Sequence, residues 1–101
     1  MQYVVIAYDG IDEKAWDRRL AARPEHAKQV EERYQAGEFL FGGGILDDSG
    51  KSIGSVIIVD FPTREALDNW LKVEAFVVGN VWEKIEIQPF KAGNSFTKSR
   101  D

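Results

Sequence analysis

Residues 55–61 read SVIIVDF, in which four consecutive β-branched apolar residues follow a serine. Successive side chains of a strand alternate between the two faces of a sheet, so this run is apolar on both faces. A strand of this kind belongs in the middle of a sheet, where both of its faces are covered. Residues 2–8, QYVVIAY, have the same character. The sequence therefore predicts two central strands.

Turn and helix signals around these runs complete the order βαββαβ. Thr63 has a side chain that suits a helix N-cap, and residues 47–52, DDSGKS, form a hairpin loop. Proline suits a first helical position and glycine a helix C-terminus, so Pro24 is expected to break the polar helical segment 12–22 and to open a new helix. The expected strands are 2–8, 38–46, 55–61 and about 82–89, and the expected helices run over 24–37 and 64–72.

Two right-handed crossovers in this order predict an α+β fold with a four-stranded antiparallel sheet. The first and third strands are central, and both helices cover the same face. The fourth strand alternates, with Ile85 and Ile87 against Lys84, as an edge strand does. Two helices leave the second apolar face of the sheet open. We expect a second copy of the chain to cover it, in an obligate homodimer.

Composition limits the classes of function that the chain can have. Its 101 residues make one domain, with 44% hydrophobic and 30% charged residues. The net charge of −4, without a basic cluster, argues against nucleic acid or an anionic membrane as a partner, and no apolar stretch is long enough to span a bilayer. The chain has no cysteine and begins without a basic leader, which favours a cytoplasmic protein.

Two glycine-containing stretches near the second strand resemble ligand-binding motifs. A phosphate loop would need glycine where Ile45 stands and a helix after Ser52, and a β-branched run follows instead, so we reject nucleotide binding. The glycines of residues 42–44, with Gly43 at their centre, indicate a bulge in an edge strand or a cradle for a ligand. With one histidine and no cysteine, the sequence predicts no metal site.

The single histidine, His26, closes the segment RPEH at residues 23–26. With Pro24 at a helix start, its imidazole is expected in the first turn, at the rim of the buried face. Free amides there, and Arg23 nearby, disfavour imidazolium, and a neutral histidine can accept a proton from a substrate. The alternative is a histidine that only caps or packs at the helix start, which fits a lone histidine without a visible partner.

Three segments resemble the YCII-related (YciI-like) family, and the resemblance covers residues 1–91. They are RLAARPEH at 19–26, GGGILDDSGKSIGSVIIVDFPTREAL at 42–67, which includes Ser55 in the Gly-Ser pair before the third strand, and EIQPFK at 86–91. The resemblance implies a ferredoxin-like fold in a dimeric α+β barrel, without a cofactor. It also implies a pocket between sheet and helices in which a histidine and an aspartate are the catalytic pair. Residues 92–101 are expected to be a polar, partly disordered tail.

The chain departs from the family at the aspartate. The family pattern D-P-[FY]-V-x-x-G-[VL] meets EAFVVGNV at residues 74–81, so Glu74 stands at the aspartate position, Ala75 at the proline and Asn80 at the glycine. Glutamate keeps the carboxylate on a longer side chain. The missing proline and displaced glycine indicate that the loop follows another path.

Two functions are consistent with these residues. The first is a lyase or isomerase acting on a small, aromatic or carboxylic, molecule. In it His26 is the general base, Glu74 orients it or stabilises the imidazolium, and Arg23 holds a substrate anion, with Gly43 and Ser55 in the pocket. The second is a dimeric module that binds a small metabolite or a protein partner in the same cleft without catalysis.

Overall fold

A computed structural model describes residues 1–97 of the chain and confirms the expected order of strands and helices. Two short helices, α3 and α4, are added to that order. The elements are β1 (Gln2–Asp9), α1 (Ala15–Gln35), β2 (Phe39–Leu46), β3 (Ser52–Asp60), α2 (Arg64–Leu71), α3 (Ala75–Val78), β4 (Trp82–Phe90) and α4 (Asn94–Thr97).

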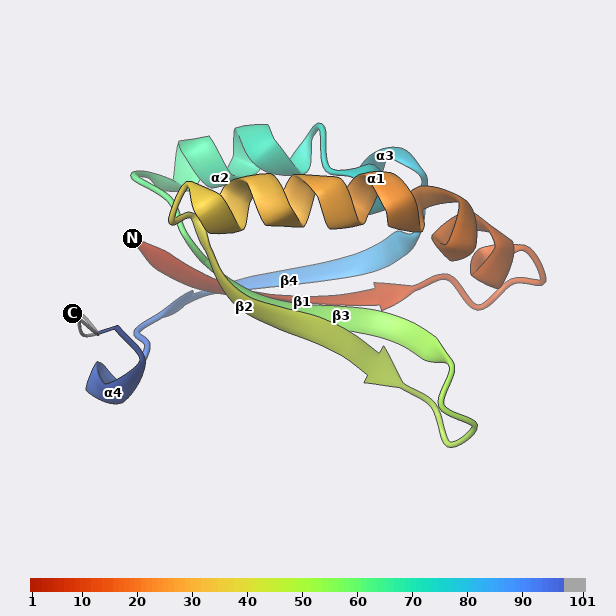
Figure 1. Ribbon diagram of the computed structural model, residues 1–101. Coiled ribbons are helices and arrows are strands. Elements are labelled where there is room, and N and C mark those ends of the chain that lie inside the picture. Colours follow the sequence, from red (N-terminus) through yellow and green to blue (C-terminus); the bar gives the residue numbers. More distant parts are fainter. Residues whose placement is uncertain (98–101) are drawn as a thin grey trace.

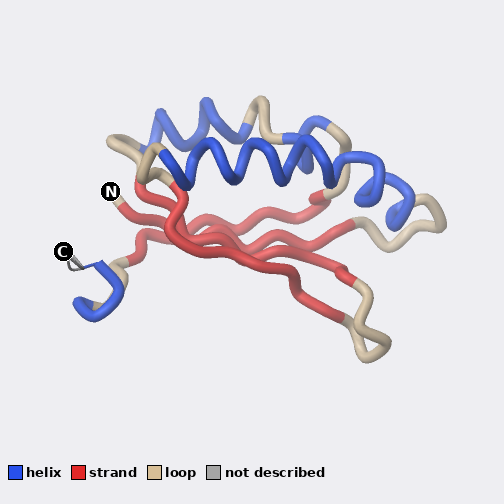
Figure 2. The backbone as a smooth tube through the Cα atoms, viewed as in Figure 1, coloured by secondary structure: helices blue, strands red, loops and turns tan. Residues whose placement is uncertain are grey.

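The four strands form one antiparallel sheet in the order β2-β3-β1-β4, so the two strands that are apolar on both faces are central, as predicted. Val5 lies opposite Ile57 on one side and Ile87 on the other. Figures 1 and 2 show α1 and α2 side by side on one face of this sheet. The α+β fold with both helices on one face is therefore confirmed.

The hydrophobic core lies between this face of the sheet and the helices. Every second residue of β1 and β3 is buried there, and Leu67 of α2 is fully buried against them. The hydroxyl of Thr63 accepts a hydrogen bond from the Ala66 amide and caps α2, as its place in the sequence predicts. The core consists of Tyr3, Val5, Ala7, Phe39, Ile57, Val59, Phe61, Leu67, Phe76, Val81 and Trp82.

The opposite face of the sheet carries apolar side chains that no helix covers. Val4 and Ile6 of β1 and Val56 and Ile58 of β3 are half-buried there, and Phe41 of β2 is 74% exposed. Figure 2 shows both long helices on the other side. This face is the surface on which we expect a second copy, and the homodimer stays a prediction.

The prediction that Pro24 breaks one helix and opens another is wrong. α1 continues through Pro24 from Ala15 to Gln35. Proline has no amide hydrogen, so the Leu20 carbonyl loses its helical partner and the helix bends without ending. Figure 1 shows the first turns of α1 tilted away from the remainder. His26 therefore lies inside a helix, and the free amides of a helix start do not act on it.

A tight turn joins β2 to β3, and a short tail follows β4. Residues 47–51 form the expected tight hairpin turn, in which Gly50 has a φ of 89° and the Asp47 amide bonds the Lys51 carbonyl at 2.9 Å. The predicted bulge does not fall on the three glycines, which pair regularly with β3; the register shifts lie on either side of them. In the tail the Ala92 amide donates to Gln2 at 2.7 Å, and α4 follows. The tail prediction for residues 98–101 lies outside the described residues.

Candidate active site

A cavity of about 420 Å³ lies between α1 and the half of the sheet formed by β2 and β3. Helix, strands and the short helix α3 all contribute to its walls. The lining is apolar on the core side and carries two arginines and the histidine. The lining residues are Arg19, Arg23, His26, Val30, Phe39, Gly42, Gly43, Gly44, Ser52, Ser55, Ile57 and Phe76.

The unbroken course of α1 sets the functional face of this cavity. Arg19, Arg23 and His26 are spaced i, i+4 and i+7, which places them on one side of a helix. All three line the cavity. A helix broken at Pro24, as the sequence predicts, would not hold this spacing, and Arg19 would then not share a helix face with His26.

His26 and Glu74 form a direct side-chain contact behind the cavity wall. The Nδ1 atom of His26 lies against Oε1 of Glu74; the Glu74 side chain is 0% exposed and that of His26 is 18% exposed. The His26 ring stacks on Phe76 with the ring centroids 3.9 Å apart. With Nδ1–H donating to the carboxylate, Nε2 is left as an acceptor on the imidazole. His26 and Glu74 are therefore in contact, as expected for the pair.

Glu74 also holds the backbone of the following helix. It is the N-cap of α3, and its Oε2 accepts a hydrogen bond from the Phe76 amide at 2.8 Å. One carboxylate thus accepts from the histidine with one oxygen and from the helix start with the other. Asn80, at the glycine position of the family pattern, has a φ of 55°, a left-handed conformation that asparagine tolerates.

A second group of buried polar side chains lies beside the histidine. Nε of Arg19 donates to Asp9 at 2.6 Å, and Nη2 donates to Asp9, to the Gly54 carbonyl and to Ser55 Oγ at 3.1, 2.9 and 3.0 Å. The side chains of this ion pair are 5% and 6% exposed. Ser55 Oγ also accepts from the Trp82 indole at 3.2 Å. The Arg19 guanidinium carbon lies 4.6 Å from the centre of the Phe76 ring.

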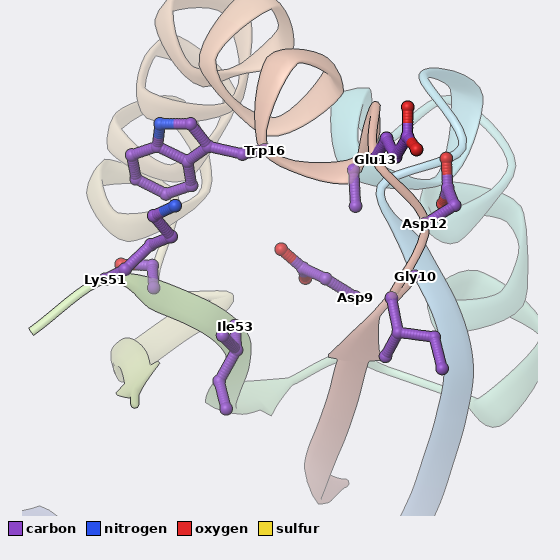
Figure 3. Close-up of a pocket in the computed structure, with 10 residues that line it drawn as sticks. Asp9, Gly10, Asp12, Glu13, Trp16, Lys51 and Ile53 are labelled. Atoms are coloured by element: carbon purple, nitrogen blue, oxygen red, sulfur yellow. The ribbon is translucent and has the colours of Figure 1, made fainter. Parts of the chain in front are cut away.

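A smaller hollow of about 200 Å³ lies at the start of α1, next to the hairpin loop, and shares Ser52 with the larger cavity. Figure 3 shows the Asp9 carboxylate directed into it and the Lys51 ammonium beside the Trp16 indole, 5.1 Å from the ring centre. Hydrogen bonds from Arg18 to Asp12 at its edge hold the pKa of that carboxyl well below its usual range.

The structure brings most of the predicted site residues to one cavity. Arg23, His26, Gly43 and Ser55 line it, and Glu74 lies directly behind His26. Arg23 is exposed at the edge, with its guanidinium carbon 5.6 Å from the centre of the Trp16 ring. Within residues 1–97, no group of three histidine, cysteine, aspartate or glutamate side chains gathers to hold a metal ion.

Three residues of the site were not predicted from the sequence: Asp9, Arg19 and Phe76. Gly42 belongs to the glycine stretch 42–44, for which the sequence predicts a bulge or a ligand cradle, and it lines the cavity. A Cβ at Gly42 would lie 2.8 Å from the Phe39 ring and 2.9 Å from Ile57, so this glycine keeps the two core side chains in place under the cavity. Helical spacing from His26 would have found Arg19 once α1 was taken as continuous. Asp9 ends β1 at a turn and carried no signal of its own.

The sequence of this chain is similar to a family model and to several known proteins. The model of the YCII-related domain matches residues 1–91. Protein YciI of Escherichia coli O6:H1 and of Shigella flexneri is 30% identical over 97 residues, which cover 90% of this chain and 97% of the relative. An uncharacterized protein of Haemophilus influenzae is 27% identical over the same extent.

Two solved structures show similarity of fold alone. 5-Chloro-2-hydroxyhydroquinone dehydrochlorinase (TftG) of Burkholderia phenoliruptrix, solved with 2,5-dihydroxybenzoquinone, has a TM-score of 0.79 at 15% identity, covering 94% of this chain and 98% of its own. An antibiotic biosynthesis monooxygenase has a TM-score of 0.51 at 23% identity, covering 92% and 99%.

Proposed function

Because this chain belongs to the YCII-related domain family, we propose that it is an enzyme, a lyase or isomerase that acts on a small oxygenated ring compound. The observation that carries the proposal is the contact between His26 and the fully buried Glu74 carboxylate at the wall of a cavity. A histidine backed by a carboxylate is a general base with a defined tautomer.

The proposed chemistry begins with proton transfer to His26. Nε2 takes a proton from the substrate, and the electron pair left behind forms a new double bond. In an elimination a leaving group departs with its own electron pair; in an isomerisation the imidazolium returns the proton to another atom. The Glu74 carboxylate, at Nδ1, stabilises the imidazolium in between. Every step uses side chains of this chain, and we propose no cofactor.

Arg23 is proposed to hold an anionic group of the substrate. Its side chain is exposed at the cavity edge, and within residues 1–97 no carboxylate forms an ion pair with it. Arg19, by contrast, is already paired with Asp9. A guanidinium without a counter-ion attracts carboxylates and phenolates. We propose that Gly43 contributes backbone and Ser55 its side chain to the same pocket.

The size and walls of the cavity support a ring compound as substrate. Its volume of about 420 Å³ suits a small ligand, and Phe39, Ile57 and Phe76 provide apolar surface against which a planar ring can pack. The neighbour of similar fold is named for removing hydrogen chloride from a hydroxylated ring and was solved with a dihydroxybenzoquinone. 5-Chloro-2-hydroxyhydroquinone and 2,5-dihydroxybenzoquinone are therefore the first compounds to test.

The assembly that we propose is a homodimer with the open sheet faces together, which would cover Phe41, Val56 and Ile58. Among the described residues 1–97, no helix has the length and apolar character to cross a membrane. A cytoplasmic location and the lack of nucleic-acid partners remain expectations from composition.

The test is a turnover assay with 5-chloro-2-hydroxyhydroquinone under anaerobic conditions, in which the released chloride is measured. Hydroxylated ring acids are screened for isomerisation in parallel. We expect turnover that falls at least a hundredfold in His26→Gln. Lys28→Gln, on an exposed turn of the same helix, is the matched control and should retain full activity.

Ligand binding without turnover, unchanged in His26→Gln, would contradict the proposal. That result would favour the alternative, a binding module that uses the same cavity without catalysis.

A further inference from the structure

We propose that the Ser55 hydroxyl is a fixed hydrogen-bond donor to a carbonyl or enolate oxygen of the ligand, and that Arg19 and Trp82 determine its direction. This inference rests on the proposed function, because it describes how the same cavity binds and activates its substrate. It assigns a second binding position, distinct from the anion position at Arg23, and thereby narrows the class of substrate to compounds with two oxygen functions.

The two neighbours of the hydroxyl can only donate to it. Ser55 Oγ lies 3.0 Å from Arg19 Nη2 and 3.2 Å from Trp82 Nε1. A guanidinium and an indole nitrogen carry hydrogens and have no acceptor lone pair, whereas a serine oxygen has two lone pairs and one hydrogen. Both lone pairs of the oxygen therefore face donors, and the hydroxyl hydrogen is excluded from these two directions.

No protein group within residues 1–97 accepts the remaining hydrogen. The nearby Gly54 carbonyl receives its hydrogen bond from Arg19 at 2.9 Å. Ser55 is 5% exposed, and it lines the cavity. A buried hydroxyl needs an acceptor for its hydrogen, and the cavity is where a ligand can supply one.

The direction of the Ser55 hydroxyl hydrogen is fixed by two side chains that are themselves held in place. Arg19 is fixed by two hydrogen bonds to Asp9, and Trp82 is buried with its ring edge-on to Phe76. A donor fixed before the ligand arrives stabilises charge on an oxygen without the cost of reorganisation. The guanidinium also polarises the hydroxyl that it donates to, which strengthens the hydroxyl as a donor.

This position matches the electron flow of the proposed reaction. When His26 removes a proton from a carbon next to a carbonyl, the electron pair moves onto the carbonyl oxygen, which becomes an enolate. The Ser55 hydrogen stabilises that charge, and the positive charge of Arg19 lies directly behind it, balanced by Asp9. A ring ketone with a second, anionic oxygen is therefore the substrate class that the cavity selects.

The first test measures binding of 2,5-dihydroxybenzoquinone by titration calorimetry. Ser55→Ala alone would leave the buried Trp82 indole without an acceptor and so destabilise the fold. The double variant Ser55→Ala, Trp82→Phe removes both partners, and Trp82→Phe is its control with the hydroxyl retained. We expect affinity about tenfold weaker in the double variant than in the control, since a hydrogen bond to a partly charged oxygen is lost. Equal affinities would overturn the inference.

The second test does not depend on that probe. A crystal structure at about 1 Å resolution locates the acceptor of the hydroxyl. We expect a water or ligand oxygen within hydrogen-bond distance of Ser55 Oγ on the cavity side, and a protein carbonyl in that place would overturn the inference. The two proposals can fail separately. If His26→Gln loses turnover but the Ser55 hydroxyl donates to a protein carbonyl, only the inference about Ser55 is contradicted. If the Ser55 hydroxyl has an acceptor in the cavity but His26→Gln keeps full turnover, only the proposed function is contradicted.

Discussion

Exchanging Glu74 for glutamine should abolish the base while leaving the fold almost intact. The two oxygens of Glu74 accept from the Phe76 amide and from His26 Nδ1. Glutamine has one oxygen and one amino group, and only the oxygen can accept from a backbone amide. Its amino group must then face His26 and donate to Nδ1. The imidazole adopts the other tautomer, with the hydrogen on Nε2, and Nε2 can no longer take a proton.

The magnitudes separate stability from activity. The cap of α3 and the side-chain volume are kept, and one hydrogen bond to a charged group becomes neutral, so the free energy of unfolding should fall by about 1 kcal/mol. An inverted tautomer in a histidine–carboxylate pair lowers the rate by roughly 10⁴-fold. Glu74→Ala, which leaves the Phe76 amide and His26 without partners, should instead cost about 2–5 kcal/mol.

The assay is ¹⁵N NMR of the imidazole, in which the two ring nitrogens have different shifts according to which carries the hydrogen. His26 is the only histidine, so the signals need no assignment. Unfolding in urea gives the stability of the same samples. A Glu74→Gln protein that keeps an unprotonated Nε2, or that retains wild-type turnover, would show that the carboxylate does not set the tautomer.

Four further outcomes follow from the structure. Sedimentation at micromolar concentration should give a mass of twice 11.4 kDa, and a monodisperse monomer would rule out the barrel. ATP and GTP should leave the melting temperature unchanged, whereas a shift that disappears in Lys51→Ala would mean that the hairpin binds phosphate. Gly42→Ala should lose about 1–3 kcal/mol of stability through overpacking, and Gly43→Ala, whose Cβ meets nothing within 4 Å, much less; equal losses would contradict the packing described. Because Arg18 lowers the pKa of Asp12, this pair stabilises the fold above the ordinary aspartate pKa of 3.8, and the stabilisation is lost as the pH falls below that value. Urea unfolding should therefore show Asp12→Asn to be less stable than wild type at pH 7, with a difference that shrinks in acid.

Strand order could be predicted because it follows from local patterns. The β-branched run around Ile57 is apolar on both faces, and no position other than the centre of a sheet suits it. The hairpin at Gly50 and the cap at Thr63 are likewise set by the backbone needs of single residues. These features do not depend on distant partners.

The interior of α1 could not be predicted in this way. Proline at position 24 lowers local helix propensity, yet tertiary packing holds the helix together through it. The pairing of Arg19 with Asp9 and with Ser55 depends on the register of three elements and has no signature in sequence spacing. His26 and Glu74 are 48 positions apart, so no local pattern relates them. Their contact could be expected only from the family resemblance.

The double use of the Glu74 carboxylate restricts which residues related chains can carry at this position. Asparagine or serine would still cap α3 and so preserve the fold, but neither brings a negative charge to the histidine. Aspartate meets both demands only if the backbone of α3 moves closer to α1 to compensate for the shorter side chain. A related chain with asparagine or serine here would therefore be recognisable from its sequence as one that keeps the cap of α3 but has lost the carboxylate behind its histidine.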